Sequence, residues 1–226
     1  MSEDKLIKRY LSFSLGVWVR PLISFIMTPI ITWLLSPAEF GKSMMYSTFY
    51  TMLQWVILLG TPNAFMRFFP QKSENEKPIL LWSSMYFPFM IWILTTVILS
   101  VFRRSINRFL LGTESSGIHI VLSLALLAGI LKSFSLNLVR MKGRGLVYSS
   151  LSIFESLSYS VCAVIFAMFV NRTFLSLVYA QLFSNFLTFI CGVIFERNYW
   201  FPIRISVRNS IEIVKFGYPF TITGLS

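Results

Sequence analysis

Charged residues, histidine and cysteine are all scarce in this 226-residue chain. Only 13% of the residues are charged, nine are acidic, and there are one histidine and two cysteines. A soluble domain carries about 25% charged residues. Paired carboxylates, metal-ligand clusters and glycine-rich phosphate loops are also missing, so we expect no catalytic residue, no metal and no cofactor. Cys162 and Cys191 lie in apolar stretches and are expected to be small hydrophobic residues without a disulfide.

Long apolar stretches take up most of the sequence, and hydrophobic residues make up 55% of it. A bilayer core of about 30 Å needs roughly 20 apolar residues of helix, and six stretches are long enough. The pattern predicts an all-α integral membrane protein, a six-helix transmembrane bundle in contact with membrane lipid. The six predicted spans cover residues 10–35, 43–66, 79–102, 118–139, 146–170 and 174–195.

The net charge of +11 comes from basic residues that lie between the apolar stretches. They form no patch on a soluble domain, so no nucleic-acid partner is expected. Short loops on the cytoplasmic side of a membrane collect Lys and Arg. Counting these residues by side predicts a multi-pass protein of the cell inner membrane with a cytoplasmic N-terminus, although the cluster at Arg103, Arg104 and Arg108 locally favours the opposite orientation.

The character of the chain changes after residue 195. Residues 196–216 are polar and basic, and Val207, Ile211 and Val214 recur at helical spacing, which predicts an amphipathic linker on the cytoplasmic surface. Residues 217–226 are apolar again but too few to span a bilayer. We therefore expect a six-helix lobe (1–195), a linker (196–216) and the start of a seventh helix (217–226), with the sequence either cut inside that helix or ending at the interface.

Three ionisable residues fall inside the predicted spans, namely Arg20, Lys132 and Glu155. Charges at such depth are costly, and they mark functional sites by default. At a rise of about 1.5 Å per residue, all three lie at a similar level near the middle of the bilayer. We expect Lys132 to pair with Glu155 and Arg20 to face a wet cavity with net positive charge. The alternatives are a purely structural ion pair and an Arg20 side chain that snorkels to the interface.

Three short motifs resemble those of polysaccharide-type flippases, a branch of the multidrug/oligosaccharidyl-lipid/polysaccharide exporter superfamily. The loop after the first predicted span reads Leu-Leu-Ser-Pro-Ala-Glu-Phe-Gly and contains Ser36, Pro37, Glu39, Phe40 and Gly41. The second span ends in a stretch, 59–68, that finishes with Arg67 and an aromatic residue, and residues 215–220 are similar to the start of that family's seventh helix.

The resemblance implies one half of a two-lobed exporter that moves an anionic lipid-linked oligosaccharide, such as a polysaccharide or O-antigen repeat unit, across the membrane by alternating access. Arg20 and Lys132 would then contact the cargo, and protonation of Glu155 would couple transport to an ion. The missing C-terminal lobe and glycan-assembly enzymes would be its partners.

Three other functions stay open at this point. A multidrug or cation antiporter of the same superfamily commonly carries an acidic residue in the first span, where this chain has Arg20. A membrane-embedded glycan polymerase or acyltransferase would need a general base or a nucleophile, and His119, the only histidine, lies at the end of a span. The third is a non-transporting remnant of a transporter.

Overall fold

The computed structural model describes residues 3–111, 117–170, 172–201 and 203–225, which are helical with short connections and contain no strand. A single 3₁₀ turn covers Phe69–Gln71. The α-helices are α1 (Glu3–Leu34), α2 (Pro37–Leu58), α3 (Thr61–Phe68), α4 (Lys77–Val101), α5 (Arg103–Leu111), α6 (Ile118–Met141), α7 (Gly145–Phe169), α8 (Leu175–Phe195), α9 (Arg197–Trp200) and α10 (Val207–Leu225).

Within the described residues, five helices are long and apolar enough to cross a membrane: residues Ser12–Leu34 of α1, and all of α4, α6, α7 and α8. Large apolar side chains lie on their outer faces, and Phe25, Trp33 and Phe169 are each at least 79% exposed. Such a surface is unstable in water but suits lipid. The chain is therefore an all-helical, multi-pass membrane protein.

The second predicted span, residues 43–66, is not one helix. α2 ends at Leu58, Leu59 and Gly60 both have positive φ (48° and 64°), and α3 starts at Thr61 with Pro62 in its first turn. Two left-handed residues followed by proline break a helix, because they interrupt its backbone hydrogen bonds. The count of six spans therefore remains a prediction. Residues 103–117 connect the third and fourth predicted spans. The first part of this connection forms the short helix α5, and residues 112–116 lie outside the described residues.

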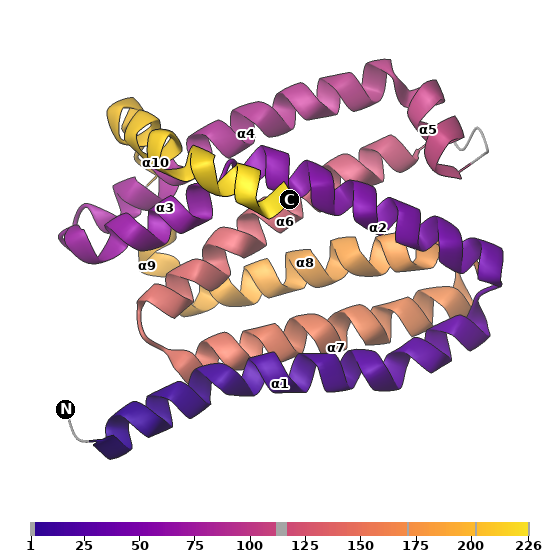
Figure 1. Ribbon diagram of the computed structural model, residues 1–226, viewed down its shortest axis with the longest axis horizontal. Coiled ribbons are helices and arrows are strands. Elements are labelled where there is room, and N and C mark those ends of the chain that lie inside the picture. Colours follow the sequence, from indigo (N-terminus) through magenta and orange to yellow (C-terminus); the bar gives the residue numbers. More distant parts are fainter. Residues whose placement is uncertain (1–2, 112–116, 171, 202, 226) are drawn as a thin grey trace.

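The helices form a curved layer in which α1 lies lengthwise along α7, α7 along α8, and α8 along α6 (Figure 1). Small residues allow these helices to approach closely. The Gly16 amide, for example, donates a hydrogen bond to Ser149 Oγ at 3.2 Å, and Gly145 faces Ser12 with no room for a Cβ. Small residues at crossings are the usual means by which membrane helices pack.

α1 and α2 diverge from the turn that joins them, and α2 packs with α4, α6 and α10 on the other side of the molecule (Figure 1). Pockets between these two groups of helices are lined by both α1 and α2. The arrangement therefore positions residues of the first predicted span opposite those of the second.

Contacts between loops show which connections share an end of the bundle. At one end, Glu39 Oε2 accepts a hydrogen bond from the Phe174 amide at 2.9 Å. At the other end, Lys142 Nζ lies 3.6 Å from a Glu74 carboxylate oxygen, and the Tyr199 hydroxyl donates to the same carboxylate at 2.6 Å. Hydrogen bonds from Lys77 and then from Tyr199 lower the pKa of Glu74 to about 2.

The connections predicted to be cytoplasmic therefore gather at one end, which we call the inner end, and those predicted to be outside gather at the other. That the inner end faces the cytoplasm remains a prediction. The boundaries at 195/196 and 216/217 also remain predictions. α10 runs across the second of them without a break, and Ser226 lies outside the described residues.

α10 packs against the break between α2 and α3 through a contact between two glycine backbones. A Cβ added to Gly217 would lie 2.8 Å from the Leu59 carbonyl oxygen, and one added to Gly60 would lie 2.1 Å from the Gly217 carbonyl oxygen. Both positions therefore require glycine, because any side chain would meet backbone that cannot move aside.

Replacing Gly217 by alanine should destabilise the protein by about 1–3 kcal/mol, the usual cost of overpacking a tight contact. Thermal unfolding in detergent micelles measures the effect. Gly41→Ala is the matched control, because Gly41 lies in α2 with no atom within 4 Å of the added Cβ. A Gly217→Ala variant that melts at or above the wild-type temperature would contradict the close contact.

Candidate functional site

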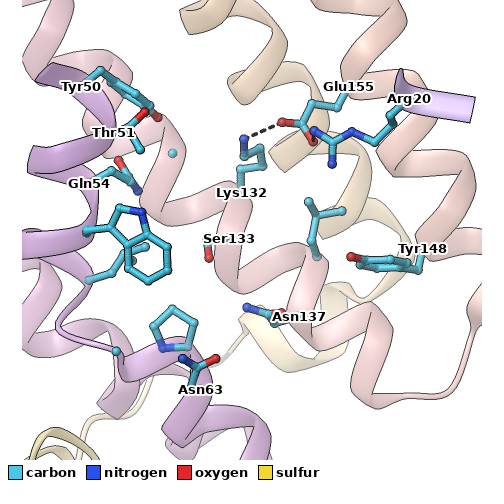
Figure 2. Close-up of a pocket in the computed structure, with 16 residues that line it drawn as sticks. Arg20, Tyr50, Thr51, Gln54, Asn63, Lys132, Ser133, Asn137, Tyr148 and Glu155 are labelled. Atoms are coloured by element: carbon cyan, nitrogen blue, oxygen red, sulfur yellow. Dashed lines mark hydrogen bonds and ion pairs between the residues drawn. The ribbon is translucent and has the colours of Figure 1, made fainter. Parts of the chain in front are cut away.

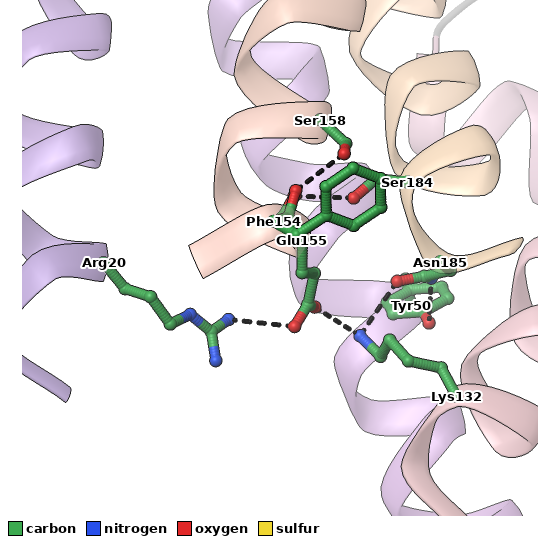
Figure 3. A network of polar contacts seen from close by, with 8 residues as sticks. All are labelled: Arg20, Tyr50, Lys132, Phe154, Glu155, Ser158, Ser184 and Asn185. Carbon is green, nitrogen blue, oxygen red and sulfur yellow. Dashed lines mark hydrogen bonds and ion pairs between the residues drawn. The ribbon is translucent and has the colours of Figure 1, made fainter. Parts of the chain in front are cut away.

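Glu155, on α7, accepts contacts from cations on two other helices (Figure 3). Lys132 Nζ, on α6, donates to Glu155 Oε1 at 2.6 Å, and one guanidinium nitrogen of Arg20, on α1, lies 3.5 Å from Glu155 Oε2. Helices far apart in the sequence thus converge at one level. From the sequence we expected Arg20 to face a cavity, and in the structure it also pairs with the carboxylate.

Side chains of α8 and α2 extend this chain of contacts (Figure 3). Lys132 Nζ also donates to Asn185 Oδ1 at 2.8 Å, and Asn185 Nδ2 donates to the Tyr50 hydroxyl at 3.2 Å. Ser184 Oγ donates to the Glu155 carbonyl oxygen at 2.7 Å. We call Arg20, Glu155, Lys132, Asn185 and Tyr50 the charged network. It crosses the bundle from α1 to α2.

The absence of a side chain at Gly129, on α6, makes room for one end of this network. A Cβ there would lie 2.3 Å from the Tyr50 hydroxyl oxygen and 2.8 Å from Gln54 Oε1. A side chain at this position would therefore displace the ends of the Tyr50 and Gln54 side chains.

Two cations and one carboxylate give the network a formal charge of +1. The side chains of Glu155 and Lys132 are 12% and 20% exposed, whereas that of Arg20 is 45% exposed. Both carboxylate oxygens of Glu155 therefore face a cation inside the bundle, while the guanidinium of Arg20 keeps donors free for other contacts. An accessible arginine beside a neutralised lysine–glutamate pair favours anions such as phosphate or carboxylate.

Two cavities adjoin the charged network, one on each side, and both are lined by Arg20, Lys132 and Glu155. The inner cavity, of about 410 Å³, extends toward Asn63, at the inner end (Figure 2). The outer cavity, of about 320 Å³, extends toward Ser43. The three ionisable residues predicted from the sequence therefore mark the boundary between two hollow spaces.

Several residues of this site were not predicted from the sequence. Tyr50 and Asn137 are two of them. The residues of α6 that line the inner cavity do follow a helical pattern, at i, i+3, i+4, i+7 and i+8 from Gly129. A polar stripe through Lys132 could therefore have identified Ser133 and Asn137.

The motif in the loop after α1 has a structural role. Ser36 caps α2 by accepting a hydrogen bond from the Glu39 amide at 3.3 Å, and Pro37 occupies the first helical turn. Glu39 pairs with Lys42 at 2.7 Å and also accepts the bond from the Phe174 amide. The motif thus starts one helix and fixes another at the same end.

The other motif residues lie away from the charged network. Phe40 packs beside Ile31, Leu35 and Ala163. Gly41 has open space around its Cα, and Arg67 is exposed in the last turn of α3. Gly60, Pro62 and Asn63 of the stretch 59–68 line the inner cavity, but Phe40, Gly41 and Arg67 line neither cavity. Their roles are therefore expected in folding or at surfaces, not in contact with a ligand in these cavities.

Comparison with known proteins decides the family. A model of the family described as "Polysaccharide biosynthesis protein" matches residues 6–226. The chain belongs to this family. The match covers almost the whole sequence and agrees with the resemblance to polysaccharide flippases. No curated protein and no solved structure matches the chain. Members of this family are transporter-type proteins of polysaccharide biosynthesis, and the family is not an enzyme family.

The geometry predicts unequal coupling of Glu155 to its two partners. In double-mutant cycles, Lys132→Met with Glu155→Gln should show a coupling free energy of about 1–3 kcal/mol. Arg20→Gln with Glu155→Gln should show less, because the Arg20 contact is longer and more exposed. Unfolding free energies measured by denaturant titration in mixed micelles provide the values. Equal coupling, or stronger coupling to Arg20, would contradict this geometry.

Proposed function

We propose that this protein takes part in moving an anionic lipid-linked oligosaccharide, such as a polysaccharide or O-antigen repeat unit, across the inner membrane by alternating access. The observation that carries the proposal is the charged network, with its net positive charge between two cavities in a membrane-spanning bundle. Membership of the polysaccharide biosynthesis family supports a flippase-type role.

The cargo chemistry follows from the charge. A lipid-linked oligosaccharide carries phosphate groups next to its lipid, and these must pass the middle of the bilayer. An unpaired phosphate there is very costly, and cations at mid-depth lower that cost. Arg20 keeps donors free for this contact, and Lys132 can join it when the cargo displaces Glu155 as its partner. A cationic drug would instead be repelled by the same network.

Removing either cation should reduce glycan export. In cells whose only copy of the gene encodes Arg20→Ala or Lys132→Ala, we expect surface glycan to fall by about tenfold or more, because a charge-assisted hydrogen bond contributes about 1.5–3 kcal/mol. Arg20→Lys should retain part of the activity. Arg104→Ala, which removes an exposed arginine of α5, is the control for net charge. Full export by Arg20→Ala at wild-type protein levels would refute the assignment.

Glu155 offers a route to ion coupling, because its protonation would release both Arg20 and Lys132. If this coupling operates, Glu155→Gln should abolish the pH dependence of transport in proteoliposomes with an imposed proton gradient. Unchanged pH dependence in that variant would leave Glu155 with a structural role only.

A further inference from the structure

The inner cavity carries three polar side chains that have no hydrogen-bond partner among the described residues. Gln54 (α2), Asn63 (α3) and Asn137 (α6) all line it (Figure 2). Their side chains make no hydrogen bond with any residue that the structure describes. Gln54 Oε1 is shielded from solvent, and no donor among the described residues reaches it.

This differs from the usual role of amides in membrane helices, which is to bond one helix to another. Asn185 has that role here, since it is 3% exposed and bonds to both Lys132 and Tyr50. Buried polar groups in proteins are nearly always hydrogen-bonded, and Gln54 Oε1 is a buried exception. Asn63 and Asn137 are half-buried and open to the same cavity, so three amides from three helices offer donors and acceptors to a ligand there.

The kind of ligand follows from the hydrogen-bonding groups. Each amide offers both donors and an acceptor, which matches the hydroxyl and acetamido groups of a sugar. A phosphate group only accepts, so it suits the cations instead. Trp55, 38% exposed, also lines the inner cavity, and an indole face can pack against the apolar face of a pyranose ring.

The spacing along α6 fits a cargo in which sugar follows phosphate. Asn137 comes five residues after Lys132, so it lies about 7.5 Å farther along the helix axis, toward the inner end. Ser133 lies between them on the same face and also lines the inner cavity. The volume of about 410 Å³ lies within the range of roughly 300–1,000 Å³ found for small-molecule sites.

We infer that the inner cavity is a two-part site, in which Arg20 and Lys132 bind the diphosphate of the cargo and Gln54, Asn63 and Asn137 bind its lipid-proximal sugar. This inference rests on the proposed function and adds the group that recognises the glycan. It makes the three amides specificity determinants, because they contact only the part of the cargo that differs between glycans.

Binding of two defined ligands tests the inference in the full-length protein reconstituted in lipid nanodiscs. One is polyprenyl diphosphate, and the other is the same lipid diphosphate carrying a single N-acetylglucosamine. Asn63→Ala and Asn137→Ala should each weaken binding of the sugar-bearing lipid by roughly five- to tenfold, the effect of one or two lost hydrogen bonds. Binding of the bare lipid diphosphate should not change.

Gln181→Ala is the matched control, because Gln181 is an amide of α8 that lines only the outer cavity. It should leave binding of both ligands unchanged, and thermal melting of every variant verifies folding. The inference is overturned if the Asn63 and Asn137 variants bind the sugar-bearing lipid as the wild type does, or lose both ligands equally. If the wild type binds neither ligand, or Arg20→Ala weakens neither, the proposed function itself fails.

Discussion

One carboxylate held between two cations inside a lipid-facing bundle is the interaction on which the rest of the structure depends. Charges at this depth are tolerated only when they are paired or face water. Glu155 meets both conditions. Its carboxylate oxygens lie 2.6 Å from Lys132 Nζ and 3.5 Å from a guanidinium nitrogen of Arg20, and it lines both cavities. The pairing obliges α1, α6 and α7 to meet at one level, and Ser184, Asn185 and Tyr50 fix that level further through α8 and α2.

The same network explains why the bundle is hollow on both sides of it. Ionised side chains keep some water near them, because complete desolvation would cost several kcal/mol per ion. The inner and outer cavities share Arg20, Lys132 and Glu155, so anything that passes from one cavity to the other meets a net positive charge midway. The proposed selectivity for anions and the division into two cavities would thus have a single physical cause.

The sequence could predict the parts of this arrangement that depend on local properties. Hydrophobic length predicted the spans of α1, α4, α6, α7 and α8, and counting residues along helices predicted that the three ionisable residues share a level. The break at Leu59 and Gly60 was missed although Gly60 and Pro62 are local helix breakers, because Gly and Pro are both frequent inside membrane helices. Tyr50 was missed because its contacts, with Asn185 and with the space beside Gly129, come from distant parts of the chain. Contacts between distant segments leave little trace in local composition.

The central claim is a water-accessible, electropositive space at mid-membrane, and thiol modification measures it most directly. Ser133→Cys, made in a background with Cys162 and Cys191 replaced by alanine, places a thiol next to Lys132 in the wall of the inner cavity. The account predicts that a negatively charged methanethiosulfonate reacts there faster than a positively charged one, and that Arg20→Gln removes this preference. No reaction with either reagent, or faster reaction with the cation, would contradict the account.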